Sequence, residues 1–344
     1  MDSVDLLTGG MEHDATTRLA ILIPVFNDWN AVALLLPALD HALEDCPLRP
    51  EVLLVNDGST QALAPGLLVQ HFEHLHSVQI LHLRRNLGHQ RAIAVGLVHI
   101  HKHFPCKAVI VMDGDGEDRP RDVARLVNEF SRQSESSIIF AERAKRMENA
   151  MFQLCYRLYC AMHWLLTGVR VRVGNFSIVP WQAVERLVVV SELWNHYAAA
   201  VFRARLPHRT IPMDRGRRIN GESKMNFVAL LVHGLSAISV FSDVVSTRLL
   251  VMALSGIAVL AGAAGTAMAM HVAIPGWAGY AAAVSLLLLT QALFGAFLLV
   301  FTTISARANM SFIPSRDAHH FIDRQERVFP LDTLSIRRLR AGNL

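Results

Sequence analysis

Short apolar runs alternate with amphipathic stretches through the first 146 residues of this chain. The runs cover residues 19–25, 51–55, 78–83, 107–112 and 137–140. Between them lie four stretches with the apolar spacing of helices, residues 30–43, 63–74, 88–103 and 120–131. Alternation of this kind predicts an α/β fold, with a mostly parallel sheet and helices on both of its faces.

Polar side chains follow each of the five predicted strands. In order, these are Phe26-Asn27-Asp28, Asn56-Asp57-Gly58-Ser59-Thr60, Arg84-Arg85-Asn86-Leu87-Gly88, Asp113-Gly114-Asp115-Gly116-Glu117-Asp118 and Ala141-Glu142-Arg143, with Lys145 and Arg146 just beyond. Open parallel sheets bind ligands at the carboxyl ends of their strands. Carboxylates suit a base, a ribose or a metal, and arginines suit phosphates. The pattern therefore favours a nucleotide-type ligand.

The fourth strand ends in the densest group of acids in the chain. Asp113 and Asp115 are two residues apart, so on an extended chain their side chains share a face. Gly114 and Gly116 let the backbone turn there. Paired carboxylates suit a hard cation such as Mg²⁺ or Mn²⁺, which can neutralise a departing diphosphate. The alternative is a solvated acidic turn, because short acidic motifs recur by chance.

The chain is too apolar for an ordinary soluble enzyme, with 52% hydrophobic and 18% charged residues among its 344. Residues 249–306 contain no Asp, Glu, Lys or Arg. Pro275 and Gly276 divide this stretch into residues 249–270 and 278–304, each long enough for a transmembrane helix of about 20 residues. A buried helical hairpin in a soluble core is the alternative.

Basic residues flank both predicted spans but are absent from the loop between them, so both chain ends are expected in the cytoplasm. Residues 226–245 are apolar with scattered polar positions, which is typical of a helix in the headgroup layer. No signal peptide is expected. The net charge of +4 includes an arginine-rich tail, whose expected partner is anionic lipid or phosphate, not nucleic acid. The 17 histidines, including His82, His89 and His99, are interpreted as decorating exposed helix faces and loops.

Six motifs taken together resemble one enzyme family. They are residues 23–28 (IPVFND), 55–60 (VNDGST), 85–90 (RNLGHQ), 112–120 (MDGDGEDRP), 174–176 (GNF) and 218–224 (RINGESK). The set resembles the inverting family 2 glycosyltransferases, which have a GT-A fold. More narrowly, it is similar to their polyprenyl-phosphate branch, which includes dolichyl-phosphate mannose synthase and undecaprenyl-phosphate glycosyltransferases. The resemblance covers roughly residues 19–227.

The resemblance implies a role for particular residues of this chain. Asp57 and the backbone around Pro24 and Phe26 would hold the base and ribose of a nucleotide-sugar, supported by Asp28. Asp113 and Asp115 would bind Mg²⁺ or Mn²⁺, with Asp115 as the direct ligand and Asp118 beside them or the sugar. The residues implied to bind donor or acceptor phosphates are Arg85, Arg143, Arg146, Arg215, Arg218, Ser223 and Lys224. Catalysis would rest on Asp113, Asp115, Asp118 and Arg218. The alternative for Arg146 and Arg215 is a solvated basic face.

Two departures from the family pattern bear on the reaction. The family often has Asp-Ala-Asp-Leu-Gln where residues 113–117 here carry an additional acid, which raises the carboxylate count. Many members have Gly-Asp-Phe where this chain has Asn175, and an asparagine cannot act as a general base. A phosphate acceptor is already an anion and needs no proton removed. Asn175 therefore favours a lipid-phosphate acceptor over a hydroxyl.

The expected protein is thus a multi-pass enzyme of the cytoplasmic (inner) membrane that moves a sugar from a nucleotide-sugar to a polyprenyl phosphate among the membrane lipids. Transfer to a hydroxyl of a glycolipid or polysaccharide is the alternative, and a non-catalytic partner that only binds such ligands is a third. The expected parts are a tail (1–18), a cytoplasmic GT-A catalytic domain (19–225), an interfacial helix (226–247), a transmembrane hairpin (248–305) and a cytoplasmic tail (306–344). The oligomeric state is left open, a homo-oligomer included.

Overall fold

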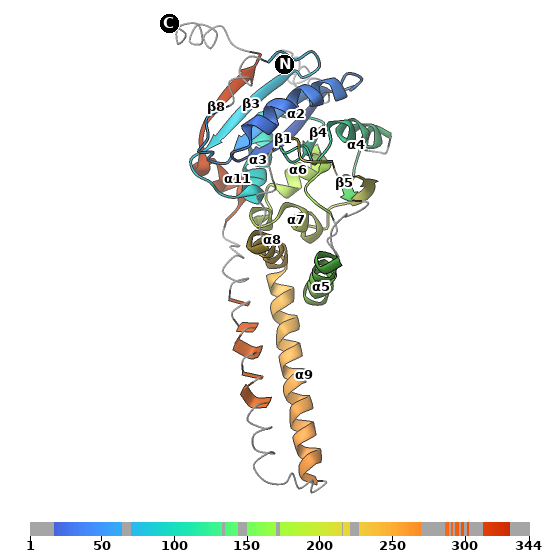
Figure 1. Ribbon diagram of the computed structural model, residues 1–344, viewed down its shortest axis with the longest axis vertical. Coiled ribbons are helices and arrows are strands. Elements are labelled where there is room, and N and C mark those ends of the chain that lie inside the picture. Colours follow the sequence, from blue (N-terminus) through green and yellow to red (C-terminus); the bar gives the residue numbers. More distant parts are fainter. Residues whose placement is uncertain are drawn as a thin grey trace, which may run out of the picture. The chain divides into compact units, whose positions relative to one another are not determined.

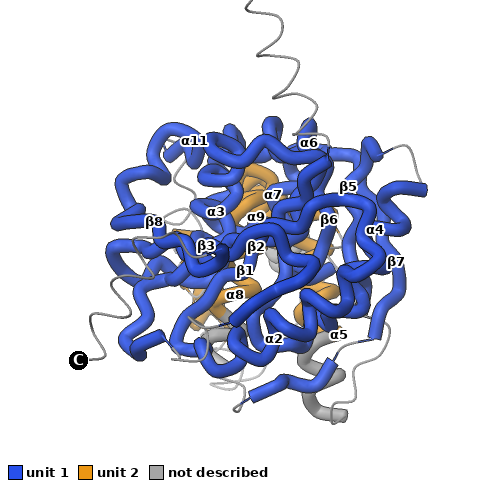
Figure 2. Tube along the Cα trace, turned by 90° about the horizontal axis from the view of Figure 1, so that it is seen from above, with its two compact units in different colours: residues 1–149, 171–229, 310–344 blue, residues 150–170, 230–309 orange. Residues whose placement is uncertain are grey.

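The computed structural model describes residues 17–63, 70–132, 135–143, 150–169, 173–214, 216–220, 227–269, 286–288, 290–291, 293–295, 297–298, 301–302 and 312–330. The chain divides into two compact units (Figure 2). Unit 1 comprises residues 1–149, 171–229 and 310–344, and unit 2 comprises residues 150–170 and 230–309.

Unit 1 is built on an eight-stranded sheet with the order β7-β5-β6-β4-β1-β2-β3-β8. Figure 1 labels β8, β3, β1, β4 and β5 of this sheet. The strands are β1 (Arg18–Val25), β2 (Arg49–Asn56), β3 (Ser77–Leu83), β4 (Ala108–Val111), β5 (Ile138–Arg143), β6 (Ser177–Pro180), β7 (His208–Met213) and β8 (Ile322–Phe329). Strands β4, β1, β2 and β3 run parallel to one another, as do β5 and β7. Strands β6 and β8 pair antiparallel with their neighbours. The expected α/β class is confirmed, with a mixed sheet.

The central strands are buried on both faces, and their alternate side chains enter two separate cores. In β1, Leu19, Ile21 and Ile23 pack with α2 (Trp29–Ala42) and α4 (Pro120–Arg132). Ala20 and Leu22 pack with α3 (His89–His103), α6 (Trp181–Leu187) and α7 (Tyr197–Arg203). Burial on both faces explains why these strands read as continuous apolar runs. The prediction of helices on both faces is confirmed.

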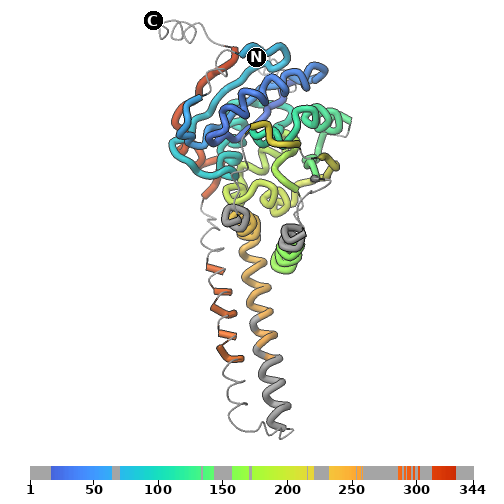
Figure 3. The backbone as a smooth tube through the Cα atoms, viewed as in Figure 1, coloured from blue at the N-terminus to red at the C-terminus, as the bar shows by residue number. Residues whose placement is uncertain are grey.

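The segment expected to be a C-terminal tail supplies an edge strand. After α11 (Pro314–Asp317) and the short 3₁₀ helix η3 (Ala318–Phe321), β8 pairs antiparallel with β3 (Figure 3). His82 Nε2 lies 3.2 Å from Glu326 Oε2 across this pair. β8 carries five consecutive polar residues, 323–327, and is largely exposed, which suits a strand at the edge of a sheet. The chain therefore returns to the sheet that it leaves before unit 2.

Unit 2 contains α5 (Ala150–Thr167), most of α8 (Phe227–Ser239) and α9 (Ser242–Ala269). Arg248 Nη1 donates to the carbonyls of Trp164 and Leu165 at 3.3 and 2.7 Å, so the cation caps the end of α5. Among the described residues, no single helix has both the length and the hydropathy of a membrane span. The segments Val232–Ser239 and Ser242–Gly256 meet these measures only as a pair, bent by 91°. Most of the second expected span lies outside the described residues.

Three further features of the structure differ from what the sequence predicts. Residues 70–74, expected to be helical, form no helix, and residues 64–69 lie outside the described part. His82 and His99 are buried, with exposed fractions of 6% and 4%, so those two do not decorate the surface. The sequence did not predict strands β6 and β7. β7 is largely exposed at the edge of the sheet, so its side chains carry no clear apolar pattern. The 3₁₀ helix η2 (Ser191–Trp194) completes the described elements of unit 1.

Candidate active site

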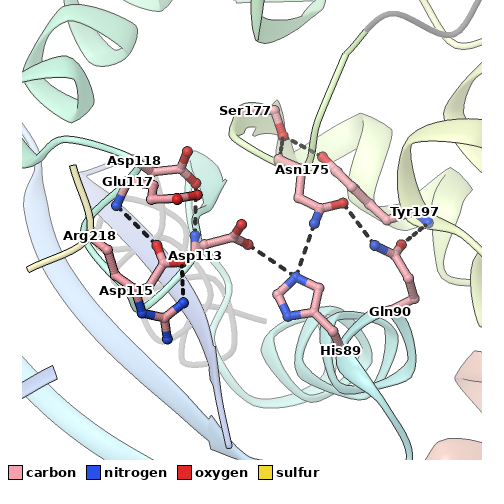
Figure 4. Close-up of polar contacts among 10 residues, drawn as sticks. All are labelled: His89, Gln90, Asp113, Asp115, Glu117, Asp118, Asn175, Ser177, Tyr197 and Arg218. Carbon is pink, nitrogen blue, oxygen red and sulfur yellow. Dashed lines mark hydrogen bonds and ion pairs between the residues drawn. The ribbon is translucent and has the colours of Figure 1, made fainter. Parts of the chain in front are cut away.

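The acid loop, residues 113–119, follows β4 at the edge where the parallel strands end. Two of its own carboxylates accept backbone N–H groups of the loop and so stabilise its turn. Asp118 Oδ2 accepts the N–H of Asp113 at 2.9 Å, and Asp115 Oδ1 accepts the N–H of Glu117 at 3.0 Å (Figure 4). Gly116 has a φ of +82°, which only glycine adopts without strain. The acid-rich sequence therefore builds a compact turn that keeps Asp113 and Asp115 together.

A second segment, residues 216–220, is docked on the acid loop. The N–H of Gly216 donates to the Glu117 carbonyl at 2.8 Å, and the N–H of Ile219 donates to the Asp115 carbonyl at 2.9 Å. A methyl group added to Gly116 would meet the Ile219 side chain at 2.3 Å, so the two segments approach closely. We call residues 216–220 the docked segment. Arg218 lies at its centre.

Arg218 joins the ends of two neighbouring strands. Its Nη2 lies 2.5 Å from Asp28 Oδ2, at the start of α2 after β1. Its Nη1 lies 3.3 Å from Asp115 Oδ2, in the loop after β4. The Arg218 side chain is only 15% exposed. Partial burial and a hydrogen-bonded guanidinium make these charge-assisted contacts stronger than exposed surface pairs.

His89, the first residue of α3, meets the acid loop from the other side. Its Nε2 lies 3.0 Å from Asp113 Oδ1, and Asn175 Nδ2 lies 3.0 Å from the same Nε2 (Figure 4). Gln90 Nε2 donates to Asn175 Oδ1 at 3.0 Å, and the Tyr197 N–H donates to Gln90 Oε1 at 2.7 Å. A continuous chain of polar contacts thus connects the backbone of α7 to Asp113.

The direction of each hydrogen bond in this series follows from the backbone N–H of Tyr197 at its start. A backbone N–H can only donate, so Gln90 turns its oxygen toward Tyr197 and its NH₂ toward Asn175. Asn175 then faces His89 with its own NH₂, which suits an unprotonated Nε2. Burial acts to lower the pKa of His89, but the carboxylates of Asp113, Asp118 and Asp115 raise it above its usual value. These influences oppose each other, so the charge on the acid loop sets the protonation of His89.

Asp57 is buried beside this site and holds the loop between β3 and α3. Its Oδ1 accepts the N–H of Leu87 at 2.7 Å, and its Oδ2 accepts the N–H of Gly88 at 2.9 Å. Burial raises the pKa of Asp57 more than these two hydrogen bonds lower it. A Cβ on Gly58, whose φ is +67°, would lie 2.5 Å from the backbone N of Asn86. The structure gives Asp57 a loop-holding role, and its expected contact with a base stays a prediction.

The remaining expected site residues are distributed as follows. Pro24 is buried near the end of β1, and the side chain of Phe26 is 41% exposed. Arg85 lies over the ring of Phe321 at 5.9 Å. Arg143 is the last residue of β5 and pairs with Met213 of β7 through the backbone. Arg146, Arg215, Ser223 and Lys224 lie outside the described residues. The expected residues that touch one another are Asp28, Asp113, Asp115, Asp118 and Arg218.

Sequence reasoning gave no role to His89, Gln90 or Tyr197. His89 could have been found, because it directly follows Gly88 beyond a predicted strand end. Gln90 ends the same motif, residues 85–90, and could have been found with it. Tyr197 could not, because it lies outside every motif and its partners are distant in sequence. The Tyr197 hydroxyl lies 2.6 Å from Ser177 Oγ, and burial raises the pKa of Tyr197 well above its usual value.

A small, open pocket with a cavity volume of about 20 Å³ adjoins the acid loop. Asp118, Glu142, Phe176 and Asp214 are among the residues that line it. Arg119, also in the lining, is paired with Asp122 at 3.1 Å and with Asp214 at 3.6 Å. The pocket is therefore bordered by carboxylates, which bind sugar hydroxyl groups as hydrogen-bond acceptors.

The acid loop fits a hard divalent cation. Within the described ranges, no three His, Cys, Asp or Glu side chains are grouped as a complete metal site. Mg²⁺ usually takes only one or two carboxylates from a protein and the rest of its ligands from water and substrate phosphates. Asp115 Oδ2 and the buried Asp113 Oδ1 are the carboxylate oxygens that would hold such a cation. The donor set suits Mg²⁺ or Mn²⁺ bound together with a diphosphate.

Comparisons with known proteins find glycosyltransferases. Residues 20–178 match the family model described as glycosyl transferase family 2. The chain is 23% identical over 229 residues to an uncharacterized glycosyltransferase of Synechocystis sp., covering 66% of this chain and 70% of that protein. It is 25% identical over 228 residues to the undecaprenyl-phosphate 4-deoxy-4-formamido-L-arabinose transferase of Photorhabdus laumondii, covering 64% and 67%.

A third relative is the dodecaprenyl-phosphate galacturonate synthase of Rhizobium johnstonii. The identity is 26% over 183 residues, which cover 53% of this chain and 52% of that protein. The matched part of this relative is therefore about half of its length.

Proposed function

Because the chain carries a glycosyltransferase family 2 domain, we propose that it transfers a sugar from a nucleotide-sugar to a polyprenyl phosphate, with inversion at the anomeric carbon. The observation that carries this proposal is the meeting of Asp28, Asp113, Asp115 and Arg218 at the ends of parallel strands. Such strand ends are where open α/β sheets bind nucleotides. At these strand ends, the carboxylates that would bind a cation lie next to the Arg218 guanidinium that would bind phosphate.

The donor would bind with its diphosphate over the acid loop. Asp113 and Asp115 would hold Mg²⁺ or Mn²⁺, which neutralises the negative charge of the leaving diphosphate when bound. Arg218 would supply a second positive charge, in the planar geometry that suits phosphate oxygens. The sugar would lie over the open pocket beside Asp118. Catalysis would then rest on positioning and on electrostatic stabilisation of the leaving group.

The acceptor would be a lipid phosphate. An oxygen of this phosphate attacks the anomeric carbon from the face opposite the diphosphate, the bond to the diphosphate breaks, and no proton has to be removed from the acceptor. The asparagine at position 175, which cannot act as a base, is compatible with this step. Two of the relatives are named for transfer involving dodecaprenyl or undecaprenyl phosphate. Arg143, Arg146, Arg215, Ser223 and Lys224 remain the proposed phosphate-binding residues, with Pro24, Phe26, Asp57 and Arg85 on the donor side.

The course of the chain supports a cytoplasmic domain on a membrane hairpin. Residues 230–309 leave unit 1 and return to it, because β8 pairs with β3 of the same sheet. A segment that starts and ends on one side of a membrane must cross it an even number of times. Two crossings by residues 248–305, preceded by an interfacial helix in residues 226–247, satisfy this requirement. The catalytic domain, residues 19–225, would then face the cytoplasm of the inner membrane.

A transfer assay tests the proposal. The full chain, purified in detergent with Mg²⁺ or Mn²⁺, is given a panel of radiolabelled nucleotide-sugars and a short polyprenyl phosphate. Label should pass into an organic-extractable lipid and be released by mild acid, as expected for a glycosyl phosphate. Sugar transfer with no such lipid product would contradict the assigned acceptor. No metal-dependent turnover with any donor would contradict the enzyme assignment.

One observation favours a second acceptor class. His89 Nε2 lies at the site, next to Asp113, and its side chain is 43% exposed. An imidazole in this place is a group that can take a proton from a hydroxyl acceptor. The same assay with glycolipid acceptors separates the two classes, because a glycoside formed on a hydroxyl survives the mild acid that cleaves a glycosyl phosphate.

A further inference from the structure

Arg218 occupies the side of Asp115 that a metal ion would need. One carboxylate oxygen of Asp115, Oδ1, accepts the N–H of Glu117 and so helps to shape the acid loop. The other, Oδ2, lies 3.3 Å from Arg218 Nη1. Oδ2 takes no part in that hydrogen bond, so a cation that binds Asp115 through Oδ2 leaves the turn intact. The guanidinium and the cation therefore compete for one atom.

The backbone around Arg218 holds it in this place. Gly216 and Ile219 on either side donate N–H groups to the carbonyls of Glu117 and Asp115. The Ile219 side chain lies over Gly116, where no other residue type leaves it room. Arg218 Nε donates to the Asn220 carbonyl at 3.0 Å, which fixes the plane of the guanidinium. The contact with Asp115 is thus built into the docked segment and is not a chance approach of a long surface side chain.

Arg218 has a second carboxylate partner, Asp28, so one positive charge stands between two negative charges, as a metal ion would. Asp28 and Asp115 are 26% and 17% exposed, and both reach the same guanidinium. Two partly buried carboxylates that reach one guanidinium would repel each other without a positive charge between them. Arg218 supplies that positive charge from the chain itself.

We propose that Arg218 is a built-in substitute for the divalent cation in the donor-free protein. Its guanidinium neutralises Asp28 and Asp115, and a metal ion must displace it from Asp115 Oδ2. The displaced side chain remains next to the incoming diphosphate and becomes one of its ligands. Metal binding is therefore weak before the diphosphate arrives and is completed together with it. This inference rests on the proposed metal site at Asp115 but not on the identity of the sugar or acceptor.

Mn²⁺ binding without any nucleotide or lipid tests the proposal. The full chain in detergent is titrated with Mn²⁺ alone, and free Mn²⁺ is measured by electron paramagnetic resonance. Arg218→Gln should bind Mn²⁺ about tenfold more tightly than the wild type, because the competitor for Asp115 is gone. Arg217→Gln is the matched control. It removes the same charge from the adjacent, exposed residue and should stay within about twofold of the wild type.

Arg218→Lys provides a second variant that keeps the charge. An ammonium is a single point charge and does not bridge two carboxylates as a guanidinium does. The Mn²⁺ affinity of Arg218→Lys should lie between those of the wild type and Arg218→Gln. If circular dichroism shows that Arg218→Gln does not fold, the affinity of Arg218→Lys tests the proposal in its place. Equal or weaker Mn²⁺ binding by the Arg218 variants than by Arg217→Gln would overturn the proposal. So would the absence of Mn²⁺ binding in every variant.

The outcome is separable from that of the transfer assay. If Arg218→Gln tightens Mn²⁺ binding but no lipid-linked sugar forms, the acceptor assignment fails and the role of Arg218 stands. If lipid-linked sugar forms but Mn²⁺ affinity does not respond to Arg218, the enzyme assignment stands and the substitute-cation proposal fails.

Discussion

His89 Nε2 lies 3.0 Å from Asp113 Oδ1 and receives the amide group of Asn175 at the same distance. The imidazole therefore lies between the Asn175 amide and one of the two carboxylates at the centre of the site, and it donates to Asp113 when Nε2 carries a proton. Asn175 and Gln90 in turn fix the ring from the side of α7. A residue with this position affects the reaction through the placement of Asp113, whichever acceptor is used.

Replacement of His89 should slow sugar transfer without unfolding the protein. We expect His89→Ala to lower kcat/KM by about 10- to 100-fold, the range seen when residues that orient metal ligands are removed. His89→Gln is the matched control, since its amide can still donate to Asp113, and it should keep more activity than His89→Ala. Steady-state kinetics with the donor that gives transfer measure both. An unchanged kcat/KM in His89→Ala would show that Asp113 needs no partner at this position.

Asp115→Asn should abolish metal-dependent transfer and leave the fold intact. The amide oxygen can still accept the N–H of Glu117, so the acid loop keeps its turn. The lost negative charge is the one that would bind the cation. Asp45→Asn, at an exposed position after α2, controls for the substitution itself and should be fully active. Turnover and the circular dichroism spectrum are measured for both variants. A metal-dependent rate equal to that of the wild type in Asp115→Asn would refute the site assignment.

Asp57→Ala should destabilise unit 1 by about 3 kcal/mol. The substitution leaves the buried N–H groups of Leu87 and Gly88 without their acceptors, and each such loss costs about 1–3 kcal/mol. Asp57→Asn keeps one acceptor oxygen and should lose roughly half as much. Thermal unfolding monitored by circular dichroism compares the two. If Asp57→Ala unfolds like the wild type but binds nucleotide poorly, Asp57 serves the base and not the loop.

Acidification should weaken the fold through His99. Burial, together with the neighbouring His103, lowers the pKa of His99 to about 4, although Gln325 acts to raise it. The unfolded chain binds a proton at His99 below about pH 6.5, whereas the folded chain does so only near pH 4. The free energy of unfolding should therefore fall by up to about 1.4 kcal/mol per pH unit as the pH drops through this range.

His99→Leu should remove this contribution. Urea unfolding of the wild type and the variant at several pH values between 7 and 4 measures the difference in slope. The wild type should lose more stability on acidification than His99→Leu. Parallel pH dependences would mean that His99 takes up its proton as readily in the folded chain as in the unfolded one.

The amino-acid sequence determined the α/β class, the first five strands and the helices α2, α3 and α4. These elements are fixed by local patterns, because a strand buried on both faces reads as an apolar run and a half-buried helix repeats its apolar residues every three or four positions. The gathering of Asp28, Asp113 and Asp115 at one edge also followed from the sequence. Parallel strands carry their carboxyl ends to the same side of a sheet.

The tertiary structure alone decided which groups touch. The pairing of β8 with β3 joins segments more than 200 residues apart, as the contact between His82 and Glu326 shows, and no local pattern encodes such a partner. The path from Tyr197 through Gln90 and Asn175 to His89 likewise crosses separate elements. Arg218 was expected at a phosphate, and the docked segment places it on Asp28 and Asp115. Local spacing determines which element a residue joins, but contacts between elements depend on how those elements pack.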